Sequence, residues 1–146
     1  MGPFLKIVLG LAGVLALLVG LSILSDPVAF YSDYQAVSFN SSWLNELRAS
    51  GSYLIASGLL IMAGVFFERV QWLSLSVGVS LYLSFALGRL LSVIVDGLPG
   101  ETLMAAAAVE LLVGLLLLIA GGLRLCNTQA AASRPADYPV NGCAGK

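Results

Sequence analysis

Four long apolar stretches divide this chain, and they restrict its possible folds more than any other feature. They cover approximately residues 4–24, 43–67, 70–95 and 101–125. Each is close to the ~20 residues that an α-helix needs to cross a lipid bilayer. Short polar or turn-forming segments separate the stretches, such as Asp26-Pro27 and the D-G-L-P-G run at 96–100. The sequence therefore predicts an all-α integral membrane protein, folded as a four-helix bundle.

The composition excludes several other classes of protein. Hydrophobic residues make up 59% of the chain and charged residues 10%, and the mean hydropathy is +0.96. Soluble domains have roughly 25% charged residues, so a water-soluble globule is excluded. The net charge is −1 with no basic run, which argues against a nucleic-acid partner. There is no histidine, and Cys126 and Cys143 are too few and too far apart for a zinc or haem motif. We expect no metal site, no cofactor and no catalytic residue.

The segments outside the four stretches define the domain organisation. Residues 1–126 form the expected transmembrane domain, and residues 127–146, which are polar with Ala, Pro and Gly, are expected to be a disordered cytoplasmic tail. The longest connection, residues 25–42, contains several aromatic residues. It can be an ordinary interfacial loop or a lid over a site below it. Ser42 is the expected N-cap of the second span.

The distribution of Lys and Arg predicts the orientation in the membrane. In a bundle of four spans, five basic residues fall on one side, while the connections on the other side carry mostly acidic residues. The five are Lys6, Arg69, Arg124, Arg134 and Lys146. Cytoplasmic segments of membrane proteins carry an excess of Lys and Arg. We therefore expect a multi-pass protein of the bacterial inner membrane with both termini in the cytoplasm.

Charged residues within the spans mark a candidate site. A charge at the centre of a span costs roughly 2.5 to 3.5 kcal/mol on insertion scales, so it usually has a partner or a function. In the third span, six residues, most of them polar or small, repeat at spacings of 4 and 3 and should face the bundle interior. These residues, which we call the third-span stripe, are Gly78, Tyr82, Phe85, Arg89, Ser92 and Asp96. The fourth span carries one carboxylate, Glu110, among small residues.

The depths of these charges suggest which ones pair. At ~1.5 Å per residue, Arg89 lies about 9 Å, Glu110 about 13 Å and Arg48 about 6 Å from the same side of the membrane. We expect an Arg89–Glu110 ion pair, with Arg48, Glu46 and Asp96 above it. The candidate cluster, either ligand-binding or structural, comprises Glu46, Arg48, Tyr82, Arg89, Ser92, Asp96 and Glu110. A structural pair, a ligand or proton site and a partner-facing patch all stay open.

Several of the same residues carry a resemblance to a known family. They are N-E-L-R-A-S-G at 45–51, G-R-L-L-S at 88–92, D-G-L-P at 96–99 and Glu110. Together they resemble a large bacterial family of small four-span membrane proteins that is described as a domain of unknown function and is similar to the DoxX-like superfamily. The resemblance covers roughly residues 1–125. It implies a four-helix bundle in the bacterial inner membrane and says little about activity.

Three functions from different classes fit the sequence. The first is a non-enzymatic membrane protein that binds a small amphiphile, or assists a partner protein, through an outward-facing polar pocket. The second is a quinone-linked membrane oxidoreductase component, since Arg, Tyr82 and a carboxylate can bind a quinone head group. The third is a small transporter, which would have to form a homo-oligomer because four helices are few for alternating access. The sequence leaves open whether the chain is an enzyme, and its lack of catalytic equipment favours a non-enzymatic role.

Overall fold

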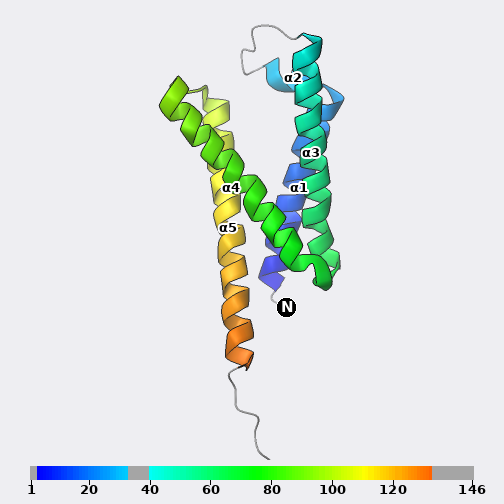
Figure 1. Ribbon diagram of the computed structural model, residues 1–146, viewed down its shortest axis with the longest axis vertical. Coiled ribbons are helices and arrows are strands. Elements are labelled where there is room, and N and C mark those ends of the chain that lie inside the picture. Colours follow the sequence, from blue (N-terminus) through cyan, green and yellow to red (C-terminus); the bar gives the residue numbers. More distant parts are fainter. Residues whose placement is uncertain (1–2, 33–39, 133–146) are drawn as a thin grey trace, which may run out of the picture.

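The computed structural model describes residues 3–32 and 40–132, with side chains described up to residue 125, and this part of the chain is helical apart from short turns. Its elements, in chain order, are α1 (Pro3–Ser25), α2 (Pro27–Ser32), α3 (Ser41–Phe66), the 3-10 helix η1 (Glu68–Val70), α4 (Gln71–Asp96) and α5 (Glu101–Ala132). Four of these helices are long and apolar enough to cross a membrane. The prediction of an all-α, four-helix membrane bundle is confirmed (Figure 1).

The connection after α1 begins with a short helix that the sequence reading missed. Pro27 occupies the first position of α2, where its missing N–H is no loss. The Asp26 carboxylate accepts a hydrogen bond from the Ala29 N–H at 3.0 Å and so caps the helix. Residues 33–39 of the connection lie outside the described residues.

Two predicted boundaries differ from the structure. Asn40, and not Ser42, caps α3, because its side-chain oxygen accepts a hydrogen bond from the Trp43 N–H at 2.9 Å. Helix α5 continues to Ala132, so residues 127–132 of the expected tail are helical. No glycine or proline interrupts residues 123–132, and alanine, the best helix former, occupies the last three positions. The rest of the predicted tail, residues 133–146, lies outside the described residues.

Small residues hold α1 and α3 together along most of their length. A methyl group on Gly20 would come within 2.8 Å of the Gly51 carbonyl oxygen, and one on Gly58 within 3.0 Å of the Gly13 carbonyl oxygen. The two backbones therefore touch directly, as small residues allow in membrane helices. Ala12 and Ala16 lie on the same buried face of α1. This makes α1 and α3 one closely packed pair.

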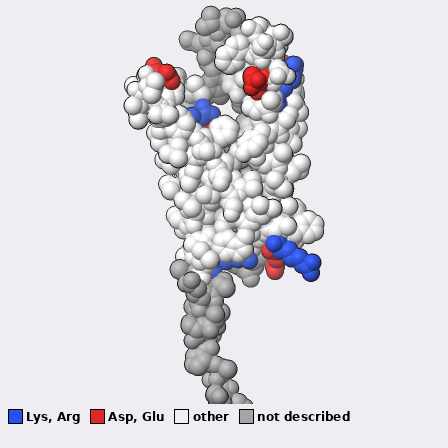
Figure 2. All heavy atoms as spheres, viewed as in Figure 1, with Lys and Arg blue, Asp and Glu red and all other residues white. Residues whose placement is uncertain are grey.

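The bundle has two different ends. At the end that we call the η1 end, α1 begins, α5 ends and η1 connects α3 to α4; at the opposite end, which we call the α2 end, α4 and α5 diverge from α1 and α3 (Figure 1). Charged side chains gather toward these two ends, and the middle of the visible face is uncharged (Figure 2). An uncharged belt between charged ends is the surface expected of a protein that spans a bilayer.

Candidate functional site

Arg89 of α4 and Glu110 of α5 form an ion pair within the spans. The Arg89 Nε atom donates a hydrogen bond to Glu110 Oε2 at 2.8 Å. The two side chains are 30% and 16% exposed. Among the described residues, the other N–H groups of the guanidinium and the second carboxylate oxygen have no hydrogen-bond partner. None of these atoms is fully buried, so they can reach a ligand.

The ion pair lies on the wall of a cavity of about 400 Å³ between the α1–α3 pair and helices α4 and α5. Most of the wall is apolar, and α1, α2, α3, α4 and α5 all contribute to it. Representative lining residues are Val19, Phe30, Leu54, Phe85 and Val109. Figure 2 shows this face of the molecule hollowed toward the α2 end, with basic atoms at the hollow. The cavity lies at the end of the bundle where α4 and α5 diverge from α1 and α3.

Two hydroxyl groups on the cavity wall already donate their protons within the protein. The Tyr82 hydroxyl of α4 donates to the Ala12 carbonyl oxygen of α1 at 2.6 Å, and this bond is buried. The Ser50 hydroxyl of α3 donates to the Leu47 carbonyl oxygen at 2.7 Å. Neither hydroxyl group therefore has a proton left to donate to a ligand. The Tyr82 hydrogen bond also links α4 to α1 at the cavity wall.

The structure brings Tyr82, Arg89 and Glu110 to one cavity, and it places the other four residues of the predicted cluster elsewhere. Ser92 donates a hydrogen bond to Asp96 at 2.8 Å, and both residues are exposed at the end of α4. Glu46 lines a separate surface depression with Asn40 and its neighbours. Arg48 is exposed and does not line the cavity.

The expectation that the whole third-span stripe faces protein is wrong for its last part. The stripe is buried at Gly78 and Tyr82, half-buried at Phe85 and Arg89, and exposed beyond Arg89. The cause is the tilt of α4, which carries its end away from α1 and α3 (Figure 1). Helical periodicity identifies the face of a helix correctly, but it does not tell how far along the helix that face is covered.

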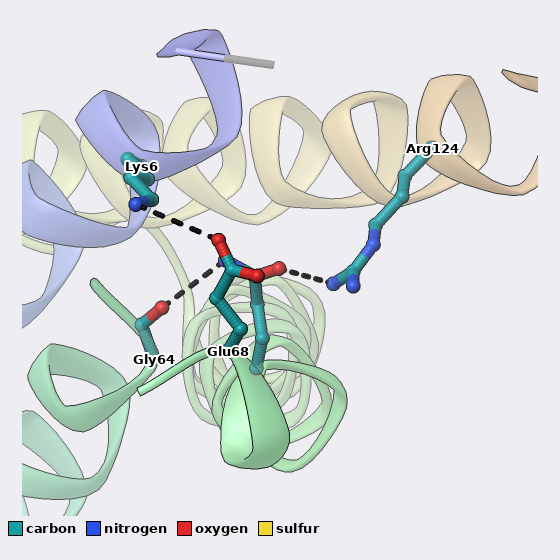
Figure 3. Close-up of polar contacts among 5 residues, drawn as sticks. Lys6, Gly64, Glu68 and Arg124 are labelled. Atoms are coloured by element: carbon teal, nitrogen blue, oxygen red, sulfur yellow. Dashed lines mark hydrogen bonds and ion pairs between the residues drawn. The ribbon is translucent and has the colours of Figure 1, made fainter. Parts of the chain in front are cut away.

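A second polar cluster, at the η1 end, was missed in the sequence reading (Figure 3). Gln71 of α4 is fully buried. Its amide nitrogen donates to the Gly64 carbonyl oxygen at 3.1 Å, and its amide oxygen accepts a hydrogen bond from Arg124 of α5. The Arg124 guanidinium also lies 5.0 Å from the centre of the Trp72 ring, within cation–π range. Figure 3 shows Arg124 reaching from α5 toward the start of α4.

Other contacts extend this cluster, which we call the Gln71 cluster. Ser74 donates to the Leu60 carbonyl oxygen at 2.6 Å, and Lys6 of α1 lies 3.9 Å from the Glu68 carboxylate, with both side chains well exposed. A signal for the cluster was present in the sequence. Extended toward the start of α4, the stripe continues from Gly78 to Ser74 and Gln71 at spacings of 4 and 3. A buried Gln on that face had to find partners.

The two polar clusters differ in what they offer to a small molecule. No group of three or more His, Cys, Asp or Glu residues able to hold a metal occurs in the described parts of the chain. The cavity at the α2 end combines an apolar wall with a few convergent polar groups, the usual composition of a small-molecule site. In the Gln71 cluster, in contrast, both the nitrogen and the oxygen of the buried amide are bonded to the protein.

Comparisons with known proteins identify a family and do not name an activity. No curated protein and no solved structure matches the chain. One family model matches residues 4–120, which include nearly all of the four spans. The protein is thus a multi-pass integral membrane protein, and the chain belongs to the family described as the domain of unknown function DUF4345.

Proposed function

We propose that this protein binds a small amphiphile in the cavity at the α2 end. The observation that carries the proposal is the Arg89–Glu110 pair on the wall of an otherwise apolar cavity of about 400 Å³. An apolar tail gains free energy from contact with the wall, and a polar head group gains hydrogen bonds from the ion pair. The cavity volume lies within the ~300–1,000 Å³ of typical ligand pockets.

The setting of this function is also a proposal. The motifs at 45–51, 88–92 and 96–99 support a bacterial inner-membrane protein related to the DoxX-like superfamily. Lys6, Arg69 and Arg124 belong to the η1 end of the bundle, which supports a cytoplasmic location for that end. The cavity then opens in the outer half of the membrane.

Photolabelling tests amphiphile binding. The purified protein in lipid nanodiscs is exposed to an alkyl-diazirine amphiphile, and the labelled residues are mapped by mass spectrometry. Labelling should concentrate on cavity residues such as Phe85 and Val109. Ala106 lines the cavity, so Ala106→Phe should fill it and remove most of this labelling. Ala108 lies on the same helix, is exposed and does not line the cavity, so Ala108→Phe is the matched control.

Two outcomes would contradict the proposal. Labelling spread evenly over the lipid-facing helix surfaces would show that the cavity holds no preferred ligand. Equal labelling of the cavity residues in Ala106→Phe and Ala108→Phe would also show that the cavity holds no preferred ligand. Melting curves of both variants establish that each is folded before the labelling is compared.

The orientation has its own test. Reporter fusions after Leu24, Phe67, Val95 and Leu125 should alternate between the two sides of the membrane, with the fusion after Leu125 in the cytoplasm. A fusion after Leu125 that reports from the periplasmic side would reverse the assignment and place the cavity in the inner half of the membrane.

A further inference from the structure

The polar groups on the cavity wall restrict the kind of head group that it can hold. Arg89 presents N–H donors that no described residue occupies. Glu110 presents a carboxylate oxygen, and Ser50 and Tyr82, which also line the cavity, have already donated their hydroxyl protons within the protein. A matching head group must therefore both donate and accept hydrogen bonds. Hydroxyl groups do both, so several of them on one small head group can accept from Arg89 and donate to Glu110.

The net charge of the cavity wall also restricts the head group. Arg89 and Glu110 compensate each other at 2.8 Å, so the wall carries no net charge. A charged head group would add an uncompensated charge in surroundings of low dielectric, which is unfavourable. An anion beside Arg89 would also lie close to the Glu110 carboxylate, and a cation beside Glu110 would lie close to the guanidinium. An uncharged head group avoids both repulsions.

On the basis of the proposed function, we infer that the ligand is an uncharged, hydroxyl-bearing amphiphile with one alkyl chain, the chemistry of a monoacylglycerol. The cavity volume of about 400 Å³ is near the lower end of the range for ligand pockets, which favours one chain over two. A quinone head group fits less well. Its oxygen atoms accept hydrogen bonds and donate none, so it would leave the Glu110 carboxylate oxygen without a donor.

Three photolabels with the same alkyl-diazirine chain test this inference. One carries a glycerol head group, one a sulfonate and one a trimethylammonium group, so that the charge of each is independent of pH. In the wild-type protein, the glycerol probe should label the cavity about tenfold more than either charged probe, a difference of about 1.4 kcal/mol in binding. This measurement needs no mutation.

Two variants then identify the source of the preference. Glu110→Gln leaves Arg89 without its counter-charge, so the preference should shift toward the sulfonate. Arg89→Gln leaves the carboxylate, so the preference should shift toward trimethylammonium. Ala108→Phe, away from the cavity, should keep the wild-type order.

The outcomes separate this inference from the proposed function. Cavity labelling in which the wild type prefers a charged probe, or treats all three alike, would overturn the inference and leave amphiphile binding intact. Absence of cavity labelling with every probe would overturn both. Unchanged preferences in the folded Glu110→Gln and Arg89→Gln variants would show that the ion pair does not select the head group.

Discussion

Polar residues lie at both ends of this bundle, but they differ in how many of their polar atoms are bonded within the protein. At the η1 end, the Gln71 amide is buried with both of its polar atoms bonded, one to α3 and one to α5. At the α2 end, Arg89 and Glu110 make one bond to each other and keep further donors and acceptors available to the cavity. Polar groups whose atoms are bonded to neighbouring helices fix those helices in place. Polar groups that keep unbonded donors or acceptors next to a cavity are available for binding. The difference indicates that the η1 end stabilises the fold, and it supports the proposal that the α2 end binds a ligand.

The close packing at the η1 end predicts the largest effect of a single substitution. A methyl group on Gly64 would lie 2.5 Å from the Ser74 Cβ atom, so Gly64→Leu must push α4 away from α3. We expect a loss of roughly 3 kcal/mol in unfolding free energy, at the upper end of ordinary overpacking costs. Thermal unfolding in detergent measures it. Gly88→Leu is the control, since a methyl group there would meet no heavy atom within 4 Å. Equal losses in the two variants would contradict close packing at the η1 end.

Removal of the Gln71 amide should have the next largest effect. Gln71→Leu leaves the Gly64 carbonyl oxygen, near the end of α3, without its side-chain donor and removes an acceptor from Arg124. A broken buried hydrogen bond costs about 1–3 kcal/mol, and we expect about 2 kcal/mol here. Ser80→Leu, at an exposed position of α4, is the comparison in the same unfolding assay. A Gln71→Leu protein as stable as the wild type would show that the Gln71 cluster does not hold this end together.

The ion pair at the α2 end should contribute less to stability. Arg89→Leu or Glu110→Leu alone leaves one charge without a partner, which costs about 3–5 kcal/mol at a fully buried site. Here the side chains are 30% and 16% exposed, so we expect about 1–2 kcal/mol for each variant. The double variant should recover much of the loss, because no lone charge is left. Strictly additive losses, measured by thermal unfolding, would mean that the two residues do not interact.

The substitution with the smallest expected effect on stability lies in the exposed end of α4. Ser92 is exposed and bonds to Asp96 on its own helix, so Ser92→Ala should change the unfolding free energy by less than about 0.5 kcal/mol. Ser74→Ala, on the same helix, removes a buried hydroxyl that donates to α3 and should cost about 1 kcal/mol. If Ser92→Ala cost as much as Ser74→Ala, the α2 end of α4 would be covered and the contrast between the ends would fail.

The sequence predicted the membrane fold and the central ion pair because both follow from short-range rules. The lengths of the apolar stretches determine the number of helices, and the spacing from Tyr82 to Arg89 identifies one face of α4. Helix tilt does not follow from spacing, so the exposure of Ser92 and Asp96 could not be predicted. The tilt depends on how whole helices pack, and close contacts such as that between Gly64 and Ser74 are part of this packing.

The packing between the cavity and the η1 end has a consequence for the size of the proposed ligand. Ile61 and Leu117 are fully buried there, and a methyl group on Gly78 would come within 2.9 Å of Leu117. No apolar tail can pass this layer without separating α3, α4 and α5. For the proposed amphiphile, with its head group at Arg89, this layer would act as a ruler that limits how many carbon atoms fit between Arg89 and the layer. Smaller side chains at Ile61 or Leu117 would lengthen the ruler, and the protein would then accept longer chains.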